Sequence, residues 1–160
     1  MSIRDESGIS LAELLVVIAL MGVITVIAVP AIVGQMSHLR LTSSVRDIST
    51  ELNAARLKAI SNNTMYRVSF TLNSGTADTY RLYVYDASAD SWSAETSRTT
   101  RSLEGGINIS PPSADFNVDF RPNGSSTGAS ICVDNTGTSG DRMEVTAQTS
   151  TGMITITTGC

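Results

Sequence analysis

A long apolar run near the amino end constrains this chain more than any other feature. Residues 14–33 form a stretch of twenty positions in which only Gly22, Thr25 and Pro30 interrupt the apolar side chains, and none is charged. About 20 such residues in one helix cross the hydrocarbon core of a bilayer, so the run predicts a transmembrane helix. Glu13 stands directly before it. A carboxylate held near the membrane centre costs about 2.5–3.5 kcal/mol, so Glu13 needs a specific role.

Size and charge restrict the function classes. A chain of 160 residues predicts one globular domain beside the membrane segment. The formal net charge of −4 argues against a nucleic-acid partner, whose footprint is clustered basic charge. His38 is the single histidine, and the sequence lacks the spacings typical of zinc proteases, nucleophile elbows, P-loops and C-x-x-C sites. We therefore expect no enzyme, no catalytic or metal site, no cofactor and no small-molecule substrate.

One loop leaves a metal question open. Residues 134–141 combine oxygen ligands with glycines, which are the ingredients of a Ca²⁺ site. Their spacing is not that of an EF-hand, and a polar hairpin explains the same residues.

The amino end does not fit an ordinary secretory signal. The polar head, residues 1–8, is short, the apolar run is too long, and no small-residue cleavage site follows it. A plain signal-anchor is one interpretation. The arginines that flank the run, Arg4 against Arg40 and Arg46, do not fix its orientation.

Beyond the run, the apolar positions narrow to one face. Six residues recur at steps of three and four, the spacing of a one-sided helix: Leu41, Val45, Ile48, Leu52, Ala55 and Ala59. Asn62 and Asn63 mark a stop. We expect one helix of about fifty residues, apolar on all sides over residues 9–34 and amphipathic over 35–62. The amphipathic half needs a partner, most simply a β-sheet of the same chain.

Residues 63–160 have the pattern of β-strands separated by turns. Alternation is clearest over 66–72 and 80–85, and shorter candidates are 107–109, 116–120, 131–133, 143–145 and 154–156. Residues 86–101 are predicted to be an exposed excursion, with Trp92 folded over its own loop or acting as a contact anchor. The fold class is therefore α+β, with the second half of a long amino-terminal helix packed on an antiparallel β domain.

The start of the run resembles a known processing signal. Gly8, followed by Ile9-Ser10-Leu11-Ala12-Glu13 and an apolar helix, is similar to the type III signal sequence of type IV pilins and type II secretion pseudopilins. The resemblance implies that prepilin peptidase removes residues 1–8 by cutting between Gly8 and Ile9 and methylates Ile9. It implies a pilin-like fold and a single pass through the bacterial inner membrane, with the β domain periplasmic before assembly. Ile9 and Ala12 depart from the commoner residues.

The same resemblance gives Glu13 a role. It implies that Glu13 meets the amino terminus of a neighbouring subunit and so sets the helix register during assembly. A boundary glutamate that reaches toward the headgroups is the simpler alternative. Gly22 and Pro30 weaken a helix and would let it bend or unwind during the move from bilayer to filament, although an ordinary proline kink is equally compatible.

A narrower likeness involves three later segments, namely residues 54–60, 120–124 and 152–156. They resemble the GspH/FimT group, which implies a minor pilin that primes or enters a type IV pilus by helix packing with other pilin-like subunits. The H-type pseudopilin of type II secretion is the alternative. DNA capture, as in some FimT-like pilins, is disfavoured because Gly152-Met153-Ile154-Thr155 lacks the arginines of the G-R-x-R stretch.

The two cysteines, Cys132 and Cys160, lie in the half of the chain that the membrane segment would export. An oxidising compartment favours a disulfide between them, and two free buried thiols are the alternative.

Overall fold

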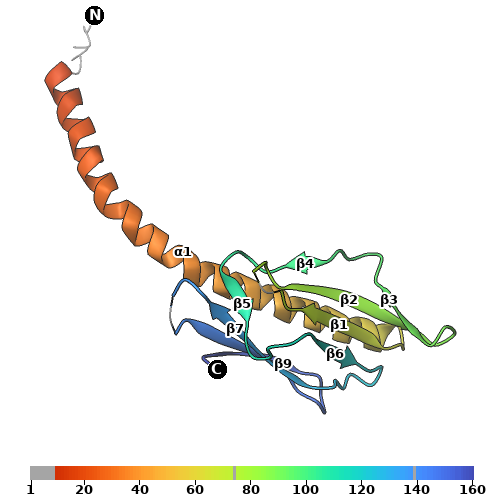
Figure 1. The fold of residues 1–160 in the computed structure, drawn as a ribbon. Coiled ribbons are helices and arrows are strands. Elements are labelled where there is room, and N and C mark those ends of the chain that lie inside the picture. The colour runs from red at the N-terminus through yellow and green to blue at the C-terminus, as the bar shows by residue number, and fades with distance from the viewer. Residues whose placement is uncertain (1–9, 74, 139) are drawn as a thin grey trace, which may run out of the picture. The chain divides into compact units, whose positions relative to one another are not determined.

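The computed structural model describes residues 10–73, 75–138 and 140–160, and for residues 26–34 it describes the backbone alone. The chain divides into two compact units, residues 1–36 and 37–160, and one helix, α1 (Leu11–Ser61), runs through the boundary between them. The strands all lie in the second unit (Figure 1). They are β1 (Tyr66–Thr71), β2 (Thr79–Asp86), β3 (Ser91–Ala94), β4 (Arg101–Ser102), β5 (Ile107–Ile109), β6 (Phe116–Phe120), β7 (Ala129–Asn135), β8 (Arg142–Ala147) and β9 (Ile154–Thr158).

The second half of α1 supplies one side of the core. All six residues of the predicted apolar face, from Leu41 to Ala59, have an exposed fraction of 0%. The helix ends where Asn63 takes a positive φ of 48°, a left-handed conformation that commonly follows the last helical turn. The prediction of a one-sided helix that packs against the chain's own β domain is confirmed.

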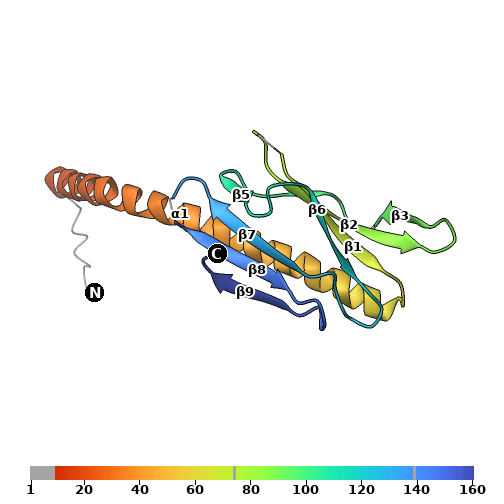
Figure 2. The same cartoon turned by 60° about the horizontal axis from the view of Figure 1, so that its bottom comes forward.

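Two antiparallel sheets supply the other side. The first, sheet A, has the order β3-β2-β1-β6, with β4 also paired to β2, and the second, sheet B, has the order β5-β7-β8-β9. Strands of both sheets lie beside the second half of α1 (Figure 2). A single apolar cluster joins that half to both sheets, and its largest fully buried side chains are Phe70 and Phe120 of sheet A.

The alternation predicted for the strands holds. Tyr66, Val68 and Phe70 of β1 are buried, and the residues between them are less so. The five shorter candidates are all strands, although β7, β8 and β9 are longer than the predicted segments. Two strands, β3 and β4, were not anticipated.

The prediction of an exposed excursion over residues 86–101 is right about exposure, since most of these residues are exposed, but wrong about an excursion. Residues 91–94 form β3, which pairs with β2, and Trp92 lies opposite Tyr85. The Trp92 ring is half-buried, 5.3 Å from the ring of Tyr85, and the Arg67 guanidinium lies 4.1 Å from its centroid. Trp92 therefore packs on sheet A and not on its own loop, because strand pairing places it on the same face as Tyr85 and Arg67.

Candidate assembly surfaces

Residues 11–25 at the start of α1 expose apolar side chains on every side. Ten large apolar residues between Leu11 and Ile24 are 45–77% exposed in the isolated chain. The apolar positions 14–18 are consecutive and exceed one helical turn of 3.6 residues, so no face of this segment is polar. Contiguous exposed apolar surface marks a membrane or protein contact. This segment is therefore a candidate assembly surface.

Glu13 is the one acidic residue in the first turn of α1. The amide N–H groups of Glu13 and Leu14 donate to the carbonyl of Ser10, at 3.0 and 3.1 Å, and so begin the helix. The Glu13 side chain is exposed, and within the described residues it has no hydrogen-bond or ion-pair partner. The amino end of a helix favours a nearby carboxylate, so its position is stable without a partner, yet the charge remains available.

The other residues predicted for processing and flexibility are placed only in part. Gly8 and Ile9 lie outside the described residues. Gly22 has open space where a side chain would be, so packing does not require glycine there. The helical backbone continues through Pro30, whose side chain is not described. Across the part of the chain that the structure describes, no helix has a stretch long and apolar enough to span a bilayer.

A chain segment between β3 and β4, residues 95–100, lies over the second half of α1, and we call it the strap. Arg98 Nη1 lies 2.6 Å from the carboxylate of Glu51, whose side chain is only 4% exposed. Lys58 Nζ lies 3.4 Å from the carboxylate of Glu95. Burial acts to raise the pKa of Glu95, but hydrogen bonds from Ser97 and Lys58 outweigh it and lower that pKa. These pairs fasten the strap to the helix.

The three segments that resemble the GspH/FimT group meet at one place. Arg56 Nε donates to the carbonyl of Gly124 at 3.3 Å. Gly124 has a φ of +82°, and Gly152 has a φ of +60°, which glycine adopts without strain. A side chain at Gly152 would overlap the Gly124 carbonyl and crowd the side chain of Arg56. This junction ties α1 to the turns that follow β6 and β8.

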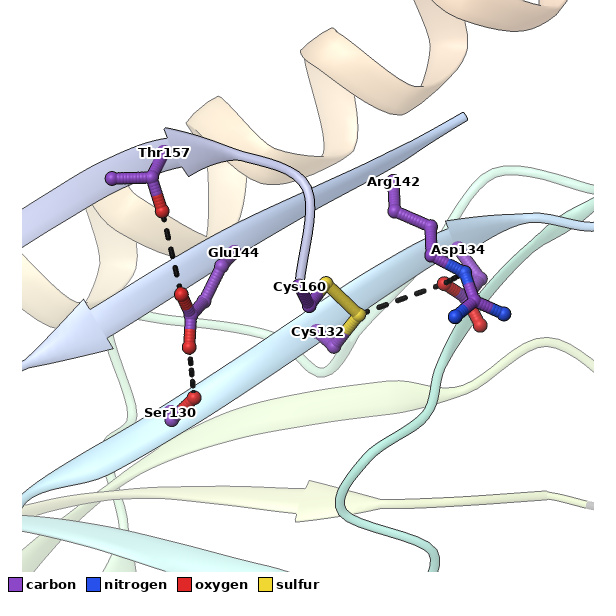
Figure 3. The surroundings of a disulfide bond; sticks show 7 residues. All are labelled: Ser130, Cys132, Asp134, Arg142, Glu144, Thr157 and Cys160. Carbon is purple, nitrogen blue, oxygen red and sulfur yellow. Dashed lines mark hydrogen bonds and ion pairs between the residues drawn. A yellow bond between two sulfur atoms is a disulfide. The ribbon is translucent and has the colours of Figure 1, made fainter. Parts of the chain in front are cut away.

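The disulfide Cys132–Cys160 is present, with the two Cα atoms 5.9 Å apart. Cys132 lies in β7 on the face of sheet B opposite to Ile131 and Val133, which are buried in the core. The chain after β9 crosses back over β8 to reach it, and Figure 3 shows the bond lying on that outer face. The bond therefore fixes the end of β9 to a central strand.

Polar side chains surround the disulfide in two groups (Figure 3). Glu144, on β8, accepts hydrogen bonds from Ser130 of β7 and from Thr157 of β9. Arg142 Nε lies 2.8 Å from the carboxylate of Asp134. These cross-strand contacts link the three strands on the solvent side.

The loop 134–141 has the character of a polar hairpin. Asp141 lies 2.9 Å from Nδ1 of His38 and accepts a hydrogen bond from Asn135 at 3.1 Å, while Asp134 is held by Arg142. Burial acts to raise the pKa of Asp141, but the contacts with Asn135 and His38 lower it. Both carboxylates are thus engaged by protein donors. Among the described residues, one group of potential metal ligands lies close together, namely Cys132, Asp134 and Cys160. The two cysteine sulfurs of this group form the disulfide.

Comparison with known proteins identifies the family of this chain. A sequence model of the type II transport protein GspH matches residues 44–152, more than half of the chain. The chain belongs to the GspH family. No curated protein sequence matches it significantly.

Solved structures agree with the fold. The minor pseudopilin EpsH from the type II secretion system of Vibrio cholerae aligns with a TM-score of 0.57 at 14% identity, over 74% of this chain and 97% of that one. The type IV minor pilin FimU of Pseudomonas aeruginosa aligns with a TM-score of 0.55 at 16% identity, over 72% and 91% of the two chains. The expected pilin-like α+β fold and the resemblance to the GspH/FimT group are confirmed.

The GspH match covers some of these surfaces and not others. The strap, the Arg56 junction and Cys132 all lie within residues 44–152, whereas Gly8, Glu13 and the apolar half of α1 precede them. The sequence did not predict the strap or the contact between Arg56 and Gly124. Glycines at turn positions, Gly124 and Gly152, were a usable sequence signal for the junction. Nothing in the sequence of residues 95–100 indicates a contact with Glu51.

Proposed function

We propose that this GspH-family chain is a minor structural subunit of a type IV pilus, held in the filament by its amino-terminal helix. Family membership supports a pilin or pseudopilin role. Assembly through the amino-terminal helix is supported by one observation. Ten large apolar side chains are exposed on all sides of this helix, beside the unpaired carboxylate of Glu13. A surface of this kind is stable in lipid or against other apolar helices, and not in water.

In this proposal the helix is inserted in the membrane before the subunit enters a filament. Prepilin peptidase cuts between Gly8 and Ile9 and methylates Ile9, and residues 9–34 then cross the inner membrane once with the β domain in the periplasm. Mass spectrometry of the mature chain tests this step. The expected mass is that of a chain whose first residue is methylated Ile9. A chain that begins at Met1 or beyond Pro30 contradicts the proposal.

Glu13 selects the axial position of the incoming subunit. An unpaired carboxylate in an apolar environment is costly, and the new amino terminus of a neighbour is a cation that removes the cost. The contact forms at one stagger of the two helices, so the charge sets register. Gly22 and Pro30 give the helix the local weakness that the transfer from bilayer to filament requires.

The variant Glu13→Ala tests this role. We expect a membrane-inserted, folded protein that fails to enter filaments, measured by immunoblots of sheared filaments and of membranes. The matched control is Glu104→Ala, because the Glu104 side chain is also exposed, at 50%, and its nearest cation is 3.9 Å away. Normal incorporation of Glu13→Ala, or equal loss in both variants, contradicts a register function.

A pseudopilus subunit of type II secretion is the second candidate. The matched family is described as a type II transport protein, and the structure that aligns over 97% of its own length is the pseudopilin EpsH. A deletion strain distinguishes the two candidates. Lost surface pili with normal secretion supports the pilus, and normal pili with exported enzymes retained in the periplasm supports the pseudopilus.

A further inference from the structure

The outer face of sheet A carries a hollow that neither the core nor the proposed assembly surfaces use. Arg81 alternates along β2 with the buried residues Tyr80 and Leu82, so its side chain lies on the face opposite to the core. On this edge of β2, two short strands pair in succession: β3 opposite residues 83–86 and β4 opposite 79–80 (Figure 1). A hollow of about 140 Å³ includes Arg81 and Thr100, close to where these strands separate.

Arg81 is a cation that the protein leaves without an acceptor. Its side chain is half-buried and its Nε is fully buried, yet within the described residues no carboxylate, carbonyl or hydroxyl accepts from the guanidinium. Arg67, its neighbour on the same face, is different, because it forms two hydrogen bonds to Asp119 at 2.6 and 2.8 Å. Native structures pair almost all buried donors, so the Arg81 Nε–H takes its acceptor from outside the chain, either water or a ligand.

The rest of the lining supplies more donors. Five of the residues that line the hollow carry hydroxyl groups with no hydrogen-bond partner among the described residues: Ser69, Thr71, Thr79, Tyr83 and Thr100. Ser69 lies directly opposite Arg81 in the pairing of β1 with β2. The lining includes no acidic side chain. One cation ringed by neutral donors is the environment that a small anion requires.

We propose that the Arg81 hollow binds a carboxylate group. A carboxylate matches the planar guanidinium fork with two parallel hydrogen bonds, and its single charge balances the single cation. A doubly charged phosphate would leave one charge uncompensated in a half-buried site. The hollow has roughly the volume of four or five water molecules, which suits a carboxylate and not a larger headgroup.

The first experiment measures binding by the full chain in mild detergent. Acetate is titrated against ¹⁵N-labelled protein at constant ionic strength, and the Arg81 Nε–H signal is assigned by its loss in Arg81→Gln. We expect a saturable shift of that signal with acetate, none with neutral acetamide, and a smaller shift with sulfate. No acetate shift, a shift shared with exposed Arg121, or a larger response to sulfate overturns the proposal.

Variants separate the fork from the charge. Arg81→Lys keeps the cation and loses the parallel hydrogen bonds, so acetate affinity, read from the unfolding midpoint, is expected to fall roughly tenfold. Arg121→Gln is the matched control, since Arg121 is exposed, and it should retain wild-type affinity. Far-ultraviolet circular dichroism checks that each variant is folded. Unchanged affinity in Arg81→Lys overturns the fork geometry.

A second arm identifies where the carboxylate comes from and rests on the proposed filament function. Arg81→Glu is compared with Arg121→Glu for entry into filaments. Loss specific to Arg81→Glu assigns the carboxylate to an acidic residue of a neighbouring subunit. Normal entry, together with acetate binding by the wild type, assigns the hollow to a free carboxylate, and the acetate titration stands whichever way the filament assay falls.

Discussion

Between Leu11 and Ile24 the large apolar side chains of α1 are 45–77% exposed, whereas the six apolar residues from Leu41 to Ala59 are completely buried. The two halves share one helix and similar residue types. They differ in periodicity, since the first is apolar on every side and the second on one face only. One-sided apolarity can be satisfied by a sheet of the same chain, and all-round apolarity requires lipid or other helices. Under the proposed function, folding therefore depends on the second half of α1 and assembly on the first.

The largest test of this division shortens one leucine in each half. Leu52→Ala removes a fully buried side chain and should lower the free energy of unfolding by about 2–5 kcal/mol. Leu15→Ala, at an exposed position, should change it by less than about 0.5 kcal/mol. Urea unfolding followed by fluorescence suits the measurement, because Trp92 is the only tryptophan and lies in the β domain.

A control in the second half separates burial from position. Leu57 belongs to the same half as Leu52 but is 63% exposed, so Leu57→Ala should behave like Leu15→Ala. If Leu15→Ala destabilises as much as Leu52→Ala, the first half takes part in the folding of the domain and the division is wrong.

The disulfide should give the next largest effect, and only on the second unit. It closes a loop between residues 28 positions apart, and the chain-entropy model gives a stabilisation of about 3–4 kcal/mol. Cys132→Ala with Cys160→Ala should lose roughly that free energy of unfolding. Reductant should reproduce the loss in the wild type and have no effect on the double variant. An unchanged midpoint in the double variant would mean that β9 is held by its hydrogen bonds with β8 alone.

The sequence predicted the features whose pattern lies within a few neighbouring residues, and it did not predict those that depend on distant segments. The buried face of α1 repeats over several turns, and the alternation in β1 repeats over several residues, so both could be read locally. The strap could not, because Arg98 and Glu51 are 47 residues apart and only the completed sheet brings them together. β3 was missed for the same reason: Ser91-Trp92-Ser93-Ala94 has little strand character, and its pairing with β2 decides its structure. Glu13 could be singled out from the sequence because it is a charge beside an apolar run and follows Gly8 at the spacing of the type IV pilin signal.

The ion pair between Arg98 of the strap and Glu51 tests what the polar edge of the second half of α1 adds to stability. Arg98→Ala leaves the nearly buried carboxylate of Glu51 without its cation, and we expect a loss of about 1–2 kcal/mol in the free energy of unfolding. This is less than for a fully buried pair because the Arg98 side chain is 31% exposed. Arg121→Ala, at an exposed position, is the control and should be nearly neutral. Equal effects would show that the strap does not depend on its ion pair.

The smallest expected effect concerns Glu95 and depends on pH. Burial acts to raise its pKa, and hydrogen bonds from Ser97 and Lys58 lower it below the ordinary value. A carboxyl group whose pKa is lower in the folded than in the unfolded state stabilises the fold above the unfolded pKa, near 4.3 for glutamate, and that contribution is lost as the pH falls through the folded pKa. Glu95→Gln should therefore be less stable than the wild type at pH 7, and the difference should shrink below about pH 4. Lys58 lies on the second half of α1, so the same titration should leave the exposed first half unaffected. Urea unfolding of both proteins from pH 7 to acid measures the difference, and a difference that is constant with pH would show that Lys58 and Glu95 do not interact as charges.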